Sequence, residues 1–129
     1  MSSEDLHVPR EVLSSEARLL HYGITSLMEE LDAMDWYRQR ADDTEDDTLK
    51  QLLLHNMREE MEHAAMLIEW LRRNNTDFAG HLKTYLFTEA PIVGIERVAE
   101  HGGEGGASGG GAGAPAGLTI GSLKGRGSR

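Results

Sequence analysis

Two long stretches with apolar residues at helical spacing most constrain the fold of this chain. The first covers about residues 14–40 and contains no proline. Its apolar residues recur every three or four positions: Leu20, Ile24, Leu27, Leu31 and Met34. The second covers about residues 49–73, after a polar break in which Asp47 or Thr48 is expected to be the N-cap. We therefore predict an all-α fold built on an antiparallel two-helix hairpin.

The rest of the chain is predicted to hold shorter helices and a tail. A third helix is expected over about residues 78–87, then Pro91 interrupts, and the sequence IVGIERVAE is expected to form a last short helix. Residues 102–117 contain nine glycines in sixteen positions, a composition typical of a flexible linker. The predicted organisation is a helical domain (1–100), a glycine-rich linker (101–117) and a C-terminal peptide (118–129).

Composition restricts the chemistry and the partners. The chain has no cysteine, so its strong metal ligands are limited to His, Asp and Glu. Residues 1–101 hold 21 acidic and 10 basic residues, a formal charge of −11, which disfavours nucleic acid and anionic membranes as partners and favours cations. Because no apolar run approaches the ~18 residues of a membrane span and the first residues lack a signal-peptide pattern, we expect a cytoplasmic protein with no membrane segment.

Three polar residues lie on helix faces that the spacing assigns to the core. Within about 60° of Glu60 on a helical wheel are Leu53, Met57, Ala64, Leu67 and Leu71. The corresponding neighbours of Glu30 are Val12, Leu19, Leu27, Met34 and Tyr37. His63 follows Glu60 by one turn, so the hairpin is expected to direct two carboxylates and one imidazole to one point. Taken singly, a core-facing Glu is usually ion-paired and a core-facing His hydrogen-bonded, but no Lys or Arg shares the middle of either stripe, which favours a metal site.

One chain supplies only half of a di-iron carboxylate centre. Such centres use a Glu from each of two helices and a Glu-x-x-His from each of two others, in a four-helix bundle. A two-fold homodimer of hairpins would therefore complete a ferritin-like four-helix bundle with a shared di-iron site made from two copies of Glu30, Glu60 and His63. The same ligands also accept Ca²⁺, Zn²⁺ or Mn²⁺ in place of iron.

A second group lies on another face of the first long helix. Glu29, Asp32 and Trp36 are spaced for one side, and are either an ordinary solvated face or an outer metal site that passes iron inward. Tyr37 lies nearer the Glu30 face and is expected to hydrogen-bond a ligand carboxylate.

Three stretches resemble the encapsulated ferritins: MEELDAMDWY (28–37), HNMREEMEHAAMLIEWLRRN (55–74) and LKTYLFTEAPI (82–92). The resemblance covers almost all of residues 7–100. It implies that Glu30, Glu60 and His63 are ferroxidase ligands. It also implies that Glu29, Asp32 and Trp36 form the outer metal site, although the family has a glutamate at the position of Asp32. It further implies an open ring of five dimers, a decamer that oxidises iron but has no cage in which to store it.

The sequence LTIGSLKG resembles the targeting peptides by which cargo docks inside encapsulin shells. The docking residues implied are Leu118, Thr119, Ile120, Gly121, Ser122 and Leu123. An apolar patch beyond a flexible tether suits docking into pockets on a partner. The expected function is therefore a ferroxidase that oxidises Fe²⁺ with O₂ and delivers iron for storage inside an encapsulin nanocompartment. The alternatives are a rubrerythrin-like peroxide-reducing di-iron protein, which would lack the usual Cys cluster, and a non-catalytic metal-binding helical scaffold.

Overall fold

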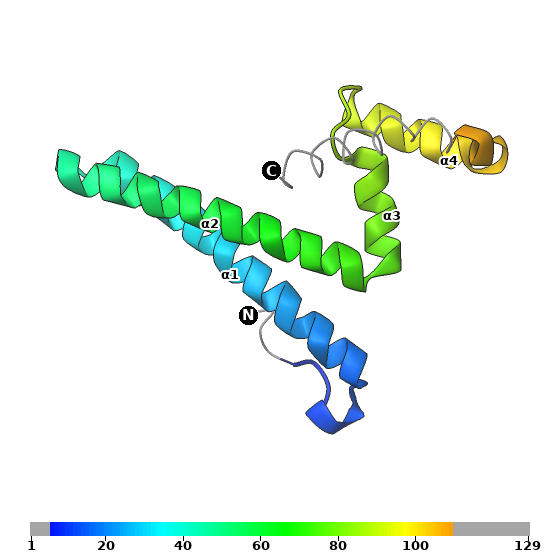
Figure 1. Ribbon diagram of the computed structural model, residues 1–129, viewed down its shortest axis with the longest axis horizontal. Helices are drawn as coiled ribbons and strands as arrows, with labels where there is room; N and C mark the ends of the chain where they lie inside the picture. The colour runs from blue at the N-terminus through cyan, green and yellow to red at the C-terminus, as the bar shows by residue number, and fades with distance from the viewer. Residues whose placement is uncertain (1–5, 110–129) are drawn as a thin grey trace, which may run out of the picture. The chain divides into compact units, whose positions relative to one another are not determined.

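The computed structural model describes residues 6–109, with side chains described up to residue 101 (Figure 1). Within that range every regular element is helical, which confirms the all-α prediction. The elements are a short 3-10 helix η1 (Arg10–Val12) and four α-helices: α1 (Ser15–Asp43), α2 (Asp47–Asn74), α3 (Thr76–Tyr85) and α4 (Ile92–Gly109). Residues up to Asn75 form one compact unit and those from Thr76 onward a second, and each is described by itself.

Side-chain caps fix where the two long helices begin. The hydroxyl of Ser14 accepts a hydrogen bond from the backbone N–H of Ala17 at 3.0 Å and starts α1. Asp46 starts α2, because its carboxylate accepts from the N–H of Leu49 at 2.9 Å. The predicted N-cap, Asp47 or Thr48, was therefore wrong by one or two residues. The carboxylate of Asp46 reaches the free N–H three positions on, and Asp47 is already in the first turn.

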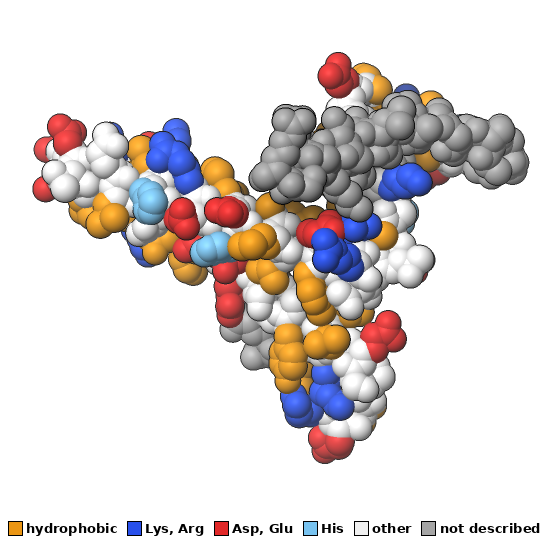
Figure 2. Space-filling view, viewed as in Figure 1, with side chains coloured by type: hydrophobic (Ala, Val, Ile, Leu, Met, Phe, Trp, Pro, Cys, Tyr) orange, Lys and Arg blue, Asp and Glu red, His pale blue; other side chains and the backbone are white. Residues whose placement is uncertain are grey.

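The two long helices pack antiparallel along a narrow seam. Its buried residues are Gly23 and Ala41 from α1, and Leu53, Met57, Ala64 and Leu71 from α2. The four α2 residues are among those predicted for the face of Glu60, so the register of that face is confirmed. In the described part of the chain no large side chain is fully buried. Hydrophobic side chains stay open over both helices on the face shown in Figure 2. The seam alone is thus a thin core.

The predicted neighbours of Glu30 are only partly correct. Val12 lies in η1 rather than on α1, and 68% of its surface is exposed. The reason is that Leu13 is extended and Ser14 caps a helix that begins at Ser15, so the helical wheel does not continue back to residue 12. Leu19 is on α1 but exposed in this single chain.

The second unit contains α3 and α4. The third helix begins at Thr76, two residues before its prediction, and ends before Phe87, whose φ of 63° lies in the left-handed region that a bulky residue rarely adopts. The last helix continues to Gly109, beyond the short segment predicted, and so includes residues 101–109 of the predicted glycine-rich linker. None of the helices in residues 6–109 is long and apolar enough to cross a membrane.

Candidate metal centre

Glu30, Glu60 and His63 converge between the two long helices. Nδ1 of His63 lies 3.1 Å from Oε1 of Glu60 and 3.5 Å from Oε1 of Glu30. One candidate ligand atom from each residue can be chosen so that all three lie within 4.8 Å of one another. The side chains are 26% (Glu30), 20% (Glu60) and 43% (His63) exposed, so the triad lies at the edge of the seam. The structure therefore brings together the three residues that the sequence singled out.

Helical periodicity and small seam residues put the triad in place. Glu60 and His63 are one turn apart on α2, and Glu30 reaches them from the middle of α1. Gly23 lies two turns before Glu30, and Ala64 one turn after Glu60, and both are buried. Because neither residue carries a bulky side chain, the helices approach closely enough for carboxylates from both to meet.

The three groups perturb one another's protonation. The pKa of Glu30 is raised, first by its hydrogen bond to Glu60 and then by desolvation. The pKa of Glu60 is lowered, chiefly by that same hydrogen bond and further by His63. The pKa of His63 is raised, first by its hydrogen bond to Glu60 and further by the charges of both carboxylates. A cation bound between the three groups would compete with the protons that they bind.

The donor set fits a divalent first-row metal. Carboxylate oxygen and imidazole nitrogen are ligands for iron, manganese and zinc, and metal binding displaces any protons that these groups carry. Three ligands from one chain leave coordination positions open, and the exposed edge of the triad leaves room for more donors. Glu30, Glu60 and His63 are therefore a possible metal-binding group.

The outer residues of α1 are not gathered into a comparable group. Glu29, Asp32 and Trp36 are all exposed, and the triad is the one group of three possible ligands found among the described residues. Trp36 lines a small hollow of about 230 Å³ with Gln39 and Arg40. The outer site therefore stays a prediction.

Tyr37 is half-buried on α1, and the guanidinium of Arg40 lies 5.7 Å from the centre of its ring. Among the hydrogen bonds of the described residues, none joins its hydroxyl to Glu30 or Glu60. Its contact with a ligand carboxylate remains a prediction for the assembled site. The predicted docking residues 118–123 lie outside the described residues.

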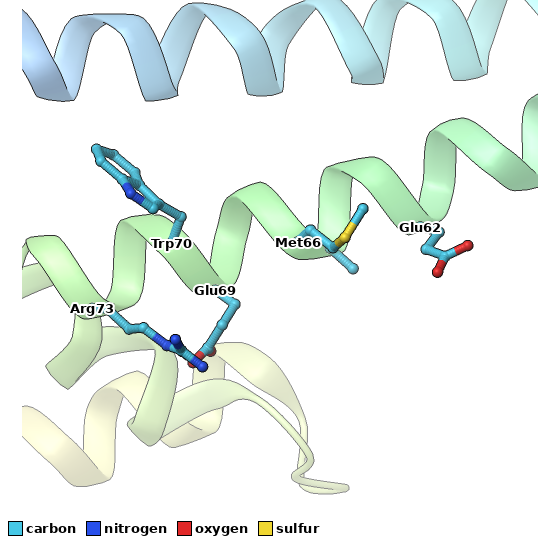
Figure 3. A pocket seen from close by; sticks show the side chains of 6 residues that line it. Glu62, Met66, Glu69, Trp70 and Arg73 are labelled. Atoms are coloured by element: carbon cyan, nitrogen blue, oxygen red, sulfur yellow. The ribbon is translucent and has the colours of Figure 1, made fainter. Parts of the chain in front are cut away.

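The residues singled out from the sequence do not include Glu69, which the structure pairs with two arginines on α2. Arg72 donates to both carboxylate oxygens, at 2.8 and 2.7 Å, and Arg73 donates to one at 2.7 Å. These cations lower the pKa of Glu69 to about 2. Figure 3 shows Glu69 and Arg73 meeting on one side of α2, while the ring of Trp70 points towards α1. These residues and Met66 line a shallow groove of about 450 Å³. The i+3 and i+4 spacing of the arginines was the signal for this ion pair.

Similarity to known proteins agrees with this fold. The EncFtn-like family matches residues 5–89. The chain is 51% identical over 128 residues to an encapsulated ferritin-like protein from Rhodospirillum rubrum, covering 96% of this chain and 91% of the relative. It is 45% identical over 102 residues to a ferritin-like protein from Thermotoga maritima (79% and 90% covered). It is 34% identical over 124 residues to the encapsulin nanocompartment cargo protein EncC from Myxococcus xanthus (91% and 92% covered).

A solved crystal structure of a protein from Nitrosomonas europaea has the same fold, with a TM-score of 0.66 and 50% sequence identity. The alignment covers 67% of this chain and 96% of that one. The family match includes all three residues of the triad, and the relatives align over about nine-tenths of their own length. With the helical hairpin and its paired carboxylates, these similarities show that the chain belongs to the EncFtn-like family.

Proposed function

We propose that this protein is a ferroxidase that oxidises Fe²⁺ with O₂. The observation that carries the proposal is the convergence of Glu30, Glu60 and His63 at the edge of a hairpin seam. This set is half of the ligand set of a di-iron carboxylate centre. Membership of the EncFtn-like family and the ferritin-like names of its relatives support an iron-related role.

The site is proposed to form between two copies of the chain. A two-fold axis beside the triad would add a second Glu30, Glu60 and His63, and would cover apolar surface that the single hairpin leaves open. Four carboxylates would then balance the charge of two Fe²⁺ ions. The dimers are proposed to assemble further into a ring, as the resemblance to encapsulated ferritins implies for a decamer.

In this reaction iron is the substrate and supplies the redox chemistry. Two Fe²⁺ ions give one electron each to O₂, which takes up two protons to form H₂O₂ and leaves two Fe³⁺ ions. Glu30 and Glu60 neutralise the bound cations, and their hard oxygen donors favour the ferric state. His63 binds only as the neutral imidazole, so iron binding releases the proton that its neighbours stabilise. The residues hold both ions and leave positions open for O₂.

The ferric product is proposed to be stored by a partner. Relatives are named as an encapsulated ferritin-like protein and an encapsulin nanocompartment cargo protein. We propose that residues 118–123 dock this chain inside an encapsulin shell in the cytoplasm, and that the shell lumen takes up the oxidised iron.

The ferroxidase proposal is tested by two matched glutamate variants of α2. Glu60→Ala removes a ligand, whereas Glu62→Ala removes an exposed carboxylate from the same helix. We expect O₂ consumption and ferric absorbance after addition of Fe²⁺ to be lost in the first and kept in the second. Unchanged ferric formation in Glu60→Ala, with the oligomer intact, would leave the metal-binding scaffold as the better assignment.

The docking proposal is tested by co-expression with a shell protein. The full chain is expected to purify inside shells, and a variant ending at Gly117 is expected to remain outside them. Equal loading of the two would refute a role for the C-terminal peptide.

A further inference from the structure

Methionines accompany all three residues of the triad. Apart from Met1, which lies outside the described residues, every methionine of the chain is on α1 or α2. Three of them lie one helical turn from a triad residue: Met34 is four residues after Glu30, Met57 three before Glu60, and Met66 three after His63. Residues at these spacings are neighbours on one helix face, about 5–6 Å apart at Cβ.

Side-chain direction brings the sulfurs closer to the site. Long side chains on a helix lean towards the preceding turn. By this rule we expect Met34 to lean over Glu30 and Met66 over His63, and the carboxylate of Glu60 to lean over Met57. Met66 is 56% exposed and lines the groove shown in Figure 3 together with Glu62, so it is also open to peroxide from solvent. Each helix therefore carries a thioether within one turn of a triad residue.

The other two methionines offer an internal comparison. Met28 is two residues from Glu30, and Met61 directly follows Glu60, so neither shares a helix face with a triad residue. Met28 and Met34 are both half-buried on α1. Met57 is 8% exposed and Met61 is 44% exposed on α2. Accessibility from solvent and proximity to the triad therefore rank Met57 and Met61 in opposite orders.

We propose that Met34, Met57 and Met66 are sites of oxidation that capture peroxide made at the triad. This inference rests on the proposed ferroxidase function, whose two-electron reduction of O₂ yields H₂O₂. The thioether sulfur attacks one peroxide oxygen, the O–O bond breaks, and the products are methionine sulfoxide and water. The sulfoxide can be reduced again by methionine sulfoxide reductases, so the side chains act as renewable traps around the ligands.

The test compares peroxide made at the site with peroxide added to solution. Full-length protein receives Fe²⁺ in air, with catalase present to destroy peroxide that escapes, and a second iron-free sample receives H₂O₂ without catalase. Peptide mass spectrometry then measures sulfoxide at each methionine. With iron, Met57 is expected to be oxidised severalfold more than Met61, and Met34 severalfold more than Met28. With added H₂O₂, Met61 is expected to be oxidised more than Met57.

The possible results distinguish a failure of this inference from a failure of the ferroxidase proposal. If ferric iron forms but sulfoxide follows solvent exposure in both samples, or is absent with iron, the inference is wrong and the ferroxidase proposal stands. If no ferric iron forms, both are wrong. A second measurement uses Met34→Leu/Met57→Leu, which keeps side-chain volume, with Met28→Leu as its control. Faster loss of activity over successive iron additions in the double variant supports the inference, and equal loss contradicts it.

Discussion

The close contact between Gly23 and Trp70 gives a sharp prediction for Gly23→Ala. A Cβ added to Gly23 would lie 2.5 Å from Cζ3 and 2.8 Å from Cε3 of the Trp70 ring, and 3.5 Å from a methyl of Leu71. Separations under 3 Å are too short for carbon atoms, and an indole ring cannot yield as a flexible side chain does. Either the ring rotates away or α1 and α2 move apart.

The two contributions to stability have opposite signs. Overpacking a seam costs ~1–3 kcal/mol, whereas replacing a helical glycine by alanine gains ~1 kcal/mol. Gly23→Ala is therefore expected to lower the free energy of unfolding by roughly 0–2 kcal/mol. Gly80 in α3 is the matched control, because nothing lies within 4 Å of its added Cβ. Gly80→Ala should show the gain alone.

Gly23→Ala should also weaken metal binding at the triad. Gly23 precedes Glu30 by seven residues and Trp70 follows His63 by seven, so the contact lies two turns from the triad on both helices. Separating the helices there widens the gap between Glu30 and Glu60. Urea unfolding and calorimetric Co²⁺ binding are the assays, with Trp70→Leu in the Gly23→Ala background expected to restore part of the affinity. If Gly23→Ala stabilises the chain as much as Gly80→Ala does and metal affinity is unchanged, the contact does not set the helix spacing.

Other predictions follow from protonation and capping. Because the pKa of His63 is raised and metal displaces its proton, metal affinity should begin to fall, as the pH is lowered, at a pH above the usual histidine pKa. Glu60→Gln should shift this onset to lower pH in calorimetric titrations. Glu69→Gln should cost up to ~1 kcal/mol in urea unfolding, less in high salt, because the pair is exposed. The folded pKa of Glu69, about 2, is below its ordinary 4.5, so its contribution exists above pH 4.5 and is lost as pH falls towards 2; a loss on raising the pH instead would contradict this. Asp46→Ala should cost ~1 kcal/mol in thermal unfolding and Thr48→Ala much less; equal losses would refute the cap assignment.

The triad could be predicted because the helical periodicity that defines the apolar face of the seam also shows which polar residues lie on that face. Leu53, Met57, Ala64 and Leu71 define a face of α2, and any polar residue on that face must be near α1. Glu60 was therefore conspicuous from spacing alone. The prediction failed at Val12 because a wheel assumes a continuous helix, and a capping residue can end that continuity between one position and the next.

Details that depend on the pairing of two helices could not be read from either helix. The contact of Trp70 with Gly23 depends on how far α1 is shifted along α2. The apolar spacing within each helix does not fix this shift, because a shift by whole turns keeps the same faces in contact. Apolar spacing likewise says which residues share a face, but not how much of that face one partner helix covers. Leu19 and Leu31 share the pattern of core residues and remain exposed in the single chain.

The single hairpin has a thin core and an incomplete set of candidate metal ligands, and a second copy of the chain would improve both. Its seam buries no large side chain completely among the described residues, and the side chains of the triad stay 20–43% exposed. The two carboxylates of one chain carry less negative charge than two bound Fe²⁺ ions would require, so one chain would be a poor di-iron site as well as a poor core. A second copy placed against the triad would add apolar contacts and ligands through the same surface. Because one surface would serve both needs, substitutions at the triad should alter assembly as well as oxidation, and the two effects must be measured together to be separated.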